Sequence, residues 1–239
     1  CNFPIHIKID TGMRRLGFEN EEEIRYLLDK VKRGNVLHIS SVFTHLAASD
    51  DPDEDNFTQI QFHRFDKLAK IIQNNTDHHV MKHALNSAGV ERFPNNQYDM
   101  VRLGIGLYGI SAVNPEFLET VSTLKTTISQ IRTVPKGESI GYSRKGIAQY
   151  DMKIATLPIG YADGFNRRLS NGVGKVWING QLAPVVGNVC MDMCMIDVTN
   201  IEVSEGDRVI VFGAEYPATE LAKILDTIPY EVFTSVSQR

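Results

Sequence analysis

The feature that most constrains the fold of this 239-residue chain is a change of pattern near residue 120. Before that point, apolar segments of strand length alternate with segments of helical periodicity. After it, short apolar segments follow one another with Gly, Pro, Asn and Asp between them. The first pattern is typical of parallel α/β structure and the second of an antiparallel β domain. We therefore predict two domains, residues 1–118 and 119–239.

The first domain is predicted to contain four strand–helix units. Residues 4–10 alternate isoleucines with polar side chains, which is the period of a strand, and Asn20 and Glu23 form a capping signal for a helix that Gly34 ends. The expected strands are 4–10, 39–44, 79–83 and 100–103, and the expected longer helices are 20–34 and 57–72. A parallel barrel takes eight strands, so four units form either part of a larger barrel or an open sheet.

The second domain is predicted to be mainly antiparallel, with one helix at residues 218–225. Its expected strands are 126–134, 154–158, 175–178, 182–186, 195–198 and 208–212. Cys190 and Cys194 are expected to share a face of an apolar strand. Without a histidine pair a zinc site there is the weaker interpretation, and buried reduced thiols in a cytosolic protein are the better one.

Charge and hydropathy exclude several classes of partner. The formal net charge of −4 gives no indication of a nucleic-acid partner. No apolar segment approaches the roughly 18 residues of a membrane helix. We expect a cytoplasmic protein that needs no metal, nucleic acid or membrane.

Two segments place chemistry at the ends of predicted strands. His83-Ala-Leu-Asn86-Ser87 is followed, fifteen residues after the serine, by Arg102-Leu-Gly104-Ile105-Gly106. A hydroxyl, a glycine-flanked turn and an arginine can hold a phosphate and set a guanidinium beside an aromatic ring of a ligand. A simple helix cap at Ser87 and a surface arginine are the plainer alternatives.

Seven motifs in the same order carry a resemblance over essentially the whole chain. They are Lys8–Gly17, Thr44–His45, His83–Ser87, Arg102–Gly109, Gly141–Tyr142, Ile159–Gly164 and Val185–Asp192. Together they resemble the alanine racemase family. The resemblance implies the second half of a (β/α)8 (TIM) barrel that binds pyridoxal 5'-phosphate, followed by a β domain. It also implies interconversion of L- and D-alanine, which supplies D-alanine for cell-wall peptidoglycan, in a homodimer whose subunits share the active site.

The resemblance implies a cofactor site around Arg102. Arg102 is expected to face the pyridine nitrogen of the cofactor, with His83 hydrogen-bonded to it. Ser87 and the backbone of Gly104 and Ile105 are expected to hold the phosphate, and Asn86 is counted with them. A cation at the ring nitrogen disfavours its protonation, which suits racemisation better than decarboxylation.

Other roles follow from the same resemblance. Tyr142 is expected to be a catalytic base and His45 to lie beside the ring and this tyrosine; a packing tyrosine and a core histidine are the plainer alternatives. Arg15 is expected to contact the phenolic oxygen of the cofactor and the substrate carboxylate. Lys8 matches a lysine that is carbamylated in many members; a barrel-interior lysine paired with Asp10 is the alternative.

The resemblance also assigns residues that line the substrate site. Tyr161 and Met191, like Tyr142, are expected to come from the partner subunit, and Tyr230 to form part of an inner gate. Three further positions belong to the entry corridor: Asp50, Arg167 and Asn188, the last of which replaces the usual arginine.

The chain is expected to be a fragment. It begins without methionine, and no segment resembles the motif of the lysine that forms the Schiff base with the cofactor. We therefore expect the chain to be inactive alone and to self-associate, and the whole protein could be fused to another enzyme. Two other interpretations stay open: a non-catalytic dimerisation module, and an amino-acid decarboxylase of the same two-domain build, which Arg102 disfavours.

Overall fold

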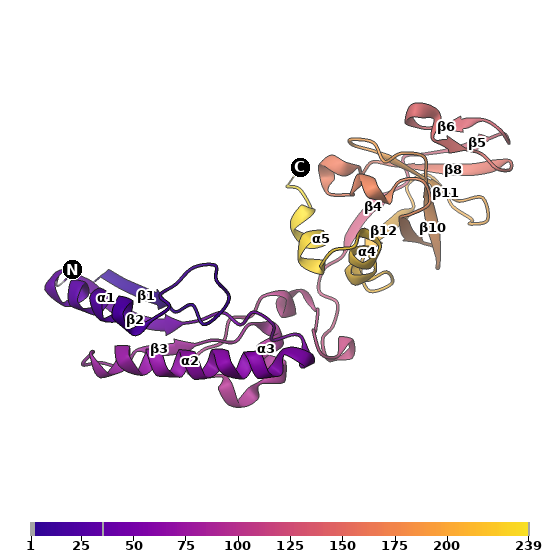
Figure 1. Cartoon of the computed structure of the whole chain (residues 1–239). Helices are drawn as coiled ribbons and strands as arrows, with labels where there is room; N and C mark the ends of the chain where they lie inside the picture. The colour runs from indigo at the N-terminus through magenta and orange to yellow at the C-terminus, as the bar shows by residue number, and fades with distance from the viewer. Residues whose placement is uncertain (1–2, 35, 239) are drawn as a thin grey trace. The chain divides into compact units, whose positions relative to one another are not determined.

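The computed structural model describes residues 3–34 and 36–238, and the chain divides into two compact units, Cys1–Glu119 and Thr120–Arg239 (Figure 1). The first unit has parallel strands with helices packed on them. The second is built around an antiparallel sheet. Among the described residues, no helix is long and apolar enough to cross a membrane.

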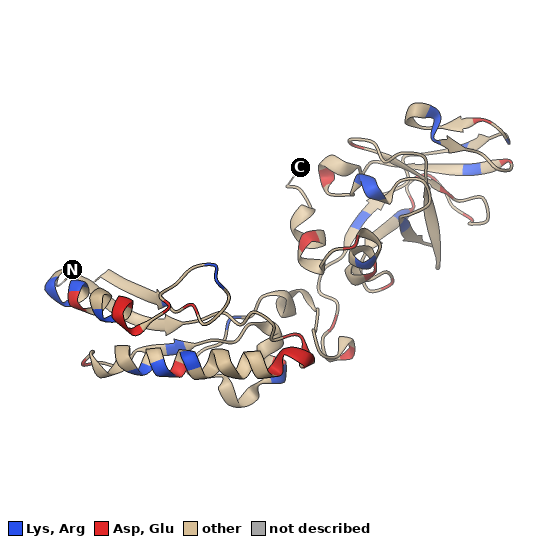
Figure 2. Ribbon diagram, viewed as in Figure 1, with Lys and Arg blue, Asp and Glu red and all other residues tan. Residues whose placement is uncertain are grey.

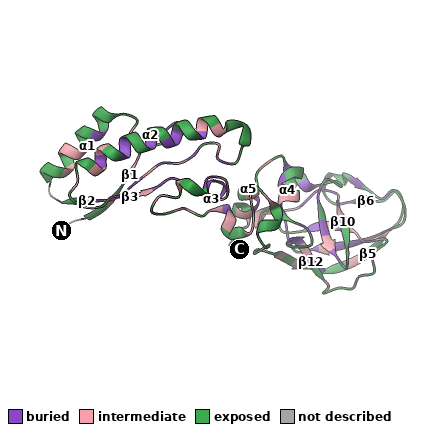
Figure 3. Cartoon of the chain, turned by 90° about the horizontal axis from the view of Figure 1, so that it is seen from below, coloured by how far each residue is buried: buried purple, intermediate pink, exposed green. Residues whose placement is uncertain are grey.

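The sheet of the first unit has three parallel strands in the order β1-β2-β3. They are β1 (Phe3–Lys8), β2 (Leu37–Phe43) and β3 (Met81–His83). The helices are α1 (Glu21–Gly34), α2 (Asp55–Asn74) and the short α3 (Ser87–Arg92). Figure 3 shows the buried residues along one side of α2, where Phe65 and Ile72 pack into the core with Ile9 and Ile24.

The predicted fourth strand at residues 100–103 is wrong. Met100 forms only an isolated parallel bridge with His83. The backbone N–H of Arg102 donates to the carbonyl of Leu85, and the chain then turns into a 3-10 helix at Ile105–Tyr108. Arg102 therefore follows a single bridge, not a strand.

The predicted start of α1 is confirmed. The Asn20 side chain accepts a hydrogen bond from the backbone N–H of Glu23 at 2.9 Å, and the Glu23 carboxylate accepts one from the backbone N–H of Glu19 at 2.7 Å. Figure 2 shows acidic residues in the first turn of this helix and basic residues at its end. The acidic residues lie at the positive end of the helix dipole and the basic residues at its negative end, and both placements stabilise the helix.

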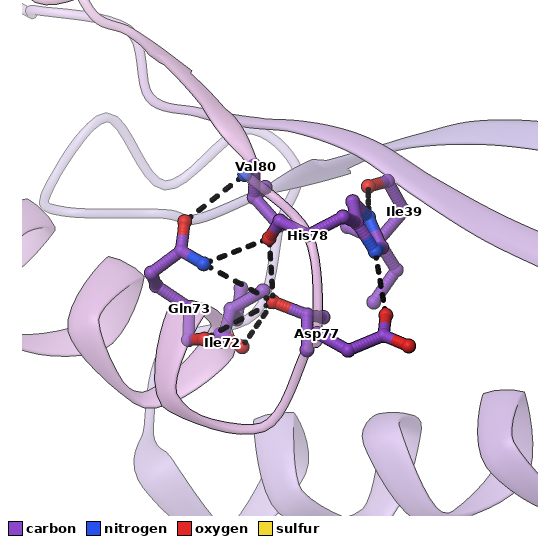
Figure 4. A network of polar contacts seen from close by, with 7 residues as sticks. Ile39, Ile72, Gln73, Asp77, His78 and Val80 are labelled. Atoms are coloured by element: carbon purple, nitrogen blue, oxygen red, sulfur yellow. Dashed lines mark hydrogen bonds and ion pairs between the residues drawn. The ribbon is translucent and has the colours of Figure 1, made fainter.

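A histidine side chain secures the turn before β3 (Figure 4). His78 Nε2 lies 2.8 Å from the carbonyl oxygen of Ile39, and His78 Nδ1 lies 3.1 Å from the Asp77 carboxylate. The register of β2 with β3 begins only at Ser41 and Met81, so the imidazole bonds a carbonyl of β2 that lies before the ladder. The Ile39 carbonyl and the Asp77 side chain both raise the pKa of His78.

The second unit contains a seven-stranded sheet in the order β4-β12-β9-β10-β11-β8-β5. The strands are β4 (Leu124–Thr127), β5 (Gln130–Val134), β8 (Met152–Leu157), β9 (Lys175–Ile178), β10 (Gln181–Val186), β11 (Cys194–Asp197) and β12 (Arg208–Phe212). β4 and β5 occupy opposite ends of this order although only Ile128 and Ser129 separate them. The sheet is therefore curled, because its two edges must meet at that link.

The single strand predicted at residues 126–134 is wrong for the same reason. The N–H of Ile128 donates to Asp207, whereas the N–H of Ser129 donates to Thr156. Successive amides thus bond to segments near opposite ends of the strand order, one just before β12 and the other in β8. The structure also adds a hairpin of β6 (Ser139–Ile140) and β7 (Gly146–Ile147) and a helix, α5 (Pro229–Ser235), that were not predicted.

The core of the second unit lies inside the curled sheet and under two helices. Leu157, Val176 and Ile196 are fully buried, and α4 (Ala218–Leu225) covers them together with α5. Cys194 is buried in β11, which raises the pKa of its thiol to about 12. Cys190 lies outside this strand, in a turn where its N–H donates to the Met193 carbonyl, so the expected shared strand face is wrong.

Candidate functional site

Arg102 is the most firmly held of the candidate residues. Its Nη1 donates to Nδ1 of His83 at 2.6 Å, and its Nη2 donates to the backbone carbonyls of Thr44 at 2.6 Å and Ala84 at 3.0 Å. The guanidinium carbon also lies 5.4 Å from the ring centroid of Phe43. Contacts from the ends of β2 and β3 therefore fix both the position and the plane of the guanidinium, and the expected bond to His83 is present.

All these contacts are neutral. Within the first unit, no described carboxylate lies within ion-pair distance of Arg102. Burial lowers the pKa of Arg102, but a guanidinium stays protonated in proteins. A half-buried cation without a carboxylate is costly, so its charge is available for an anion or an electron-rich ligand atom.

His83 is neutral. Because Arg102 can only donate, Nδ1 of His83 must be an acceptor without a proton. Burial and the neighbouring Arg102 lower the pKa of His83 to about 4. The ring is stacked on Phe43 with 5.0 Å between centroids, so its orientation is fixed as well.

Ser87 joins the start of α3 to the loop after Arg102. Its Oγ accepts hydrogen bonds from the backbone N–H of Gly104 at 2.8 Å and of Gly106 at 3.1 Å. Both acceptor positions of the hydroxyl are then filled, while its own proton has no acceptor among the described residues of the first unit. The hydroxyl, which is buried, can therefore donate to an outside oxygen.

The plainer interpretation of Ser87 as a helix cap is wrong. Asn86 is the cap of α3, since its side chain accepts from the N–H of Gly89 at 2.9 Å. The same oxygen accepts from the Ser49 hydroxyl. Asn86 therefore shapes the turn that presents Ser87.

The loop after β1 folds back on its own strand. The N–H of Asp10 donates to Phe18, and the N–H of Phe18 donates to Lys8. Gly17 has φ +130°, and a Cβ there would lie 2.7 Å from the nitrogen of Asp10, so only glycine allows this close approach. The loop holds Arg15 beside the end of the strand.

Asp10 is occupied by backbone donors. Its carboxylate accepts from the N–H of Gly12 at 2.8 Å and of Arg15 at 3.0 Å. Among the described residues no salt bridge within 4.0 Å joins it to Lys8, but the two charges attract each other, since Lys8 helps to lower the pKa of Asp10. Burial and the cations Arg15 and Arg102 lower the pKa of Lys8, although Asp10 opposes them.

The strand ends therefore form an electropositive site. Burial and then Arg102, Arg15 and Lys8 lower the pKa of His45, which keeps this histidine neutral. Arg15 and Arg102 thus act on Lys8, and all three cations act on His45, with Asp10 as the nearby carboxylate. Such a site suits a ligand with more than one negative charge.

The remaining candidate residues lie in the second unit. Tyr142 follows Gly141, whose φ is +75°, and its side chain is 69% exposed. Its backbone carbonyl accepts a hydrogen bond at 3.2 Å from the buried amide of Asn188, which also bonds Asn171 at 3.0 Å. The backbone of Tyr142 is thus held by Asn188, a residue that the sequence analysis expects in the entry corridor.

Tyr161 and Met191 are neighbours. The N–H of Tyr161 donates to Cys190 at 3.0 Å and the N–H of Ala162 to Met191 at 3.0 Å. A Cβ on Gly160 would lie 2.3 Å from the Met191 oxygen, so the two segments are in direct backbone contact.

Tyr230 lies apart in sequence, in α5, and like Tyr161 it has an exposed side chain. Arg167 lies near Cys190, since it lowers the pKa of that thiol against the larger effect of burial.

Several residues of the site were given no individual role in the sequence analysis. Phe43 packs on both His83 and Arg102, and Ser41 bonds His83. Thr11, Thr44 and Gln61 form a buried hydrogen-bonded cluster under the site. A strand pattern shows which residues share a face, but it does not show which polar residues of adjacent strands meet.

Together the fold and the site define a two-domain protein in which the ends of parallel strands bring Lys8, Arg15 and Arg102 close together. The chain matches two family models. Residues 1–112 match "Alanine racemase, N-terminal domain" and residues 121–239 match "Alanine racemase, C-terminal domain".

Individual relatives agree with these matches. "Alanine racemase 2" of Caldanaerobacter subterraneus is 40% identical over 98% of the chain and 62% of its own length, and an alanine racemase of Clostridium perfringens is 41% identical over 98% of the chain and 63% of its own length. The Bacillus anthracis alanine racemase solved with bound L-Ala-P has a TM-score of 0.90 and 33% identity over 99% of the chain and 63% of its own. The Bartonella henselae enzyme with covalently bound pyridoxal phosphate has a TM-score of 0.83 and 29% identity over 99% of the chain and 65% of its own.

The chain belongs to the alanine racemase family, and it spans about 62% of the length of the first of these relatives. The predicted fold class is confirmed: a partial (β/α)8 barrel of the kind that binds pyridoxal phosphate, followed by a mainly antiparallel β domain.

Proposed function

We propose that the whole protein is a cytoplasmic, homodimeric alanine racemase that uses pyridoxal 5'-phosphate and supplies D-alanine for the cell wall. The observation that carries the proposal is Arg102, a half-buried cation held only by neutral partners at the strand ends. A decarboxylase of this build needs a carboxylate at the ring nitrogen, and Arg102 has the opposite charge.

The residues present fit the cofactor. Ser87 has a buried hydroxyl proton with no acceptor in its unit, and the Ile105 N–H begins a 3-10 helix, where backbone donors have no internal partner. These groups would hold the phosphate, with Gly104 and Asn86 shaping the loop and the cap around it. When bound, the cofactor supplies an electron-withdrawing ring that acidifies the α-hydrogen of the amino acid.

Arg102 would set the strength of that withdrawal. A guanidinium at the ring nitrogen disfavours a second positive charge there. His83 keeps Arg102 in place because its unprotonated Nδ1 accepts from the guanidinium. The weaker electron withdrawal that results favours return of the proton to carbon over competing reactions.

Tyr142 would be the base that exchanges the proton on one face of the substrate, as the resemblance implies for a residue of the partner subunit. Arg15 would hold the substrate carboxylate. The lowered pKa of Lys8 leaves more neutral amine, which is the form that takes up carbon dioxide in carbamylation.

The test uses the whole protein supplied with pyridoxal 5'-phosphate and L-alanine. We expect D-alanine to form without release of carbon dioxide, and Tyr142→Phe to remove most of the D-alanine production. Carbon dioxide release with no D-alanine would establish the decarboxylase instead. Neither product would favour the non-catalytic dimerisation module.

A further inference from the structure

A line of hydrogen bonds crosses the sheet of the first unit and ends on Arg102. His6 Nδ1 lies 2.6 Å from Ser41 Oγ, Ser41 Oγ lies 3.0 Å from His83 Nε2, and His83 Nδ1 lies 2.6 Å from Arg102 Nη1. His6, Ser41 and His83 come from β1, β2 and β3, respectively. His6 is the register partner of Ser41, and His83 is that of Phe43, which lies two residues after Ser41 on the same face.

The direction of every bond in this line can be deduced from its end. Arg102 has only donors, so His83 Nδ1 accepts and the single proton of the neutral ring is on Nε2. His83 Nε2–H therefore donates to Ser41 Oγ. The choice of tautomer follows from the chemistry of the donor set.

Ser41 extends the deduction to β1. Its side chain is buried at 1% exposure and it has one hydroxyl proton. Within the described part of the first unit, the other group at hydrogen-bonding distance is Nδ1 of His6. Because a buried hydroxyl needs an acceptor, Ser41 donates to His6, and His6 has its proton on Nε2.

We propose that Ser41 and His6 are positioning residues for Arg102, which act by holding His83 in the Nε2–H tautomer through one directed line of hydrogen bonds. The other tautomer of His83 would set an N–H against the N–H of Arg102 and break the bond. Ser41 favours the correct tautomer because it offers an acceptor to Nε2, and His6 orients Ser41. The consequence for the cofactor ring rests on the proposed function, but the hydrogen-bond line does not.

The test is NMR of the full chain with ¹⁵N-labelled histidine and arginine. Long-range ¹H–¹⁵N spectra at neutral pH are expected to show His83 and His6 with a protonated Nε2 and an unprotonated Nδ1. In Ser41→Ala, His83 Nε2–H loses its acceptor, so its exchange with solvent and that of the Arg102 side-chain protons should speed up about tenfold, the effect of one net hydrogen bond.

Matched variants separate this effect from a general loosening of β2. Ser40→Ala changes the neighbouring serine, whose side chain points to the opposite face of the same strand, and should leave these exchange rates unchanged. Ser41→Thr keeps the hydroxyl and should restore them. His6→Ala should act in the same direction as Ser41→Ala but more weakly, because it is one bond further from His83.

Two results would overturn the proposal: a His83 proton on Nδ1, or exchange rates in Ser41→Ala equal to those in Ser40→Ala. The proposed function is judged separately, by adding pyridoxal 5'-phosphate to the wild-type chain. If the cofactor does not bind while His83 has the expected tautomer, the function fails and the positioning line stands.

Discussion

The candidate residues of the two units are held in different ways. In the first unit Arg102, His83 and Ser87 are fixed through their side chains, by hydrogen bonds of 2.6–3.1 Å. In the second unit Tyr142 and Met191 are 69% and 52% exposed and are fixed through their backbones. Under the proposed function, the side chains assigned to the cofactor are oriented in advance by hydrogen bonds. The side chains assigned to the reacting atoms are placed only through their backbones.

The largest effect on stability is expected at Gly160, where the backbone contact with Met191 sets the position of Tyr161. In Gly160→Ala the new Cβ would lie 2.3 Å from the Met191 oxygen, which is backbone and cannot move aside alone. We expect a loss of about 3 kcal/mol in the unfolding free energy of the second unit. Fluorescence of Trp177, the single tryptophan, reports unfolding of this unit.

Gly180→Ala is the matched control, because nothing lies within 4 Å of a Cβ there. Gly180 has a φ of +85°, so the alanine variant measures the cost of backbone strain without a steric clash. A cost of about 1 kcal/mol is expected. Gly160 itself has an extended backbone with φ −144°, so equal losses in the two variants would show that the contact between the segments costs no more than the strain at Gly180.

Ser87→Ala sharpens the comparison from the side of the first unit. It removes the hydroxyl that joins Gly104 and Gly106, and with it the free proton expected to reach the phosphate. We expect binding of pyridoxal 5'-phosphate to weaken about tenfold, measured by quenching of protein fluorescence. Ser129→Ala in the second unit is the control, and equal affinities in the two variants would remove Ser87 from the site.

The sequence predicts the elements well where local patterns decide them. Asn20 and Glu23 mark the start of α1, and β9, β12 and α4 have the predicted bounds. The predictions fail where tertiary pairing decides. The break at Ile128 depends on strands that lie far away in the sequence, and the loss of a strand after Met100 depends on Arg102 turning toward Leu85.

The same division applies to the candidate site. Arg102 and Ser87 stand in motifs whose residues are close in sequence, so their neighbourhood could be predicted. Phe43 and Ser41 contact His83 across strands, through the register of β2 with β3. No local pattern shows which residues of two strands far apart in the sequence are register partners, so these contacts could be found only in the structure.

A smaller effect is expected at the amide that holds Tyr142. In Asn188→Ala the carbonyl of Tyr142 and the side chain of Asn171 each lose a partner. We expect the unfolding free energy of the second unit to fall by about 1 kcal/mol, measured with Trp177. Asn188→Asp keeps the oxygen for Asn171 but sets a buried carboxylate oxygen against the Tyr142 carbonyl, so a larger loss there than in Asn188→Ala would show that the bond to Tyr142 matters. No change in either variant would contradict the role assigned to Asn188.

The smallest expected effect is a dependence on pH at the turn before β3. The pKa of His78 is raised in the folded protein, so its contribution to stability is complete below the unfolded value near 6.5 and is lost as pH rises through the folded value. The side chain is 31% exposed, so we expect about 0.5 kcal/mol. Hydrogen exchange of β2 between about pH 6 and pH 8 measures it. His78→Gln should abolish this pH dependence. If the exchange rates of this variant change with pH as they do in the wild type, the pH dependence comes from another group.

The most direct measurement concerns the charge at the cofactor ring. The chain is mixed with pyridoxal 5'-phosphate labelled with ¹⁵N at the ring nitrogen, and the ¹⁵N chemical shift reports whether that nitrogen is protonated. With Arg102 beside it we expect an unprotonated ring nitrogen in the wild-type chain and a protonated one in Arg102→Glu, because a carboxylate favours the cationic ring. Arg33→Glu, at an exposed position of α1, should behave as wild type. A ring nitrogen with the same protonation state in the wild type and in Arg102→Glu would contradict the placement of Arg102 at the cofactor.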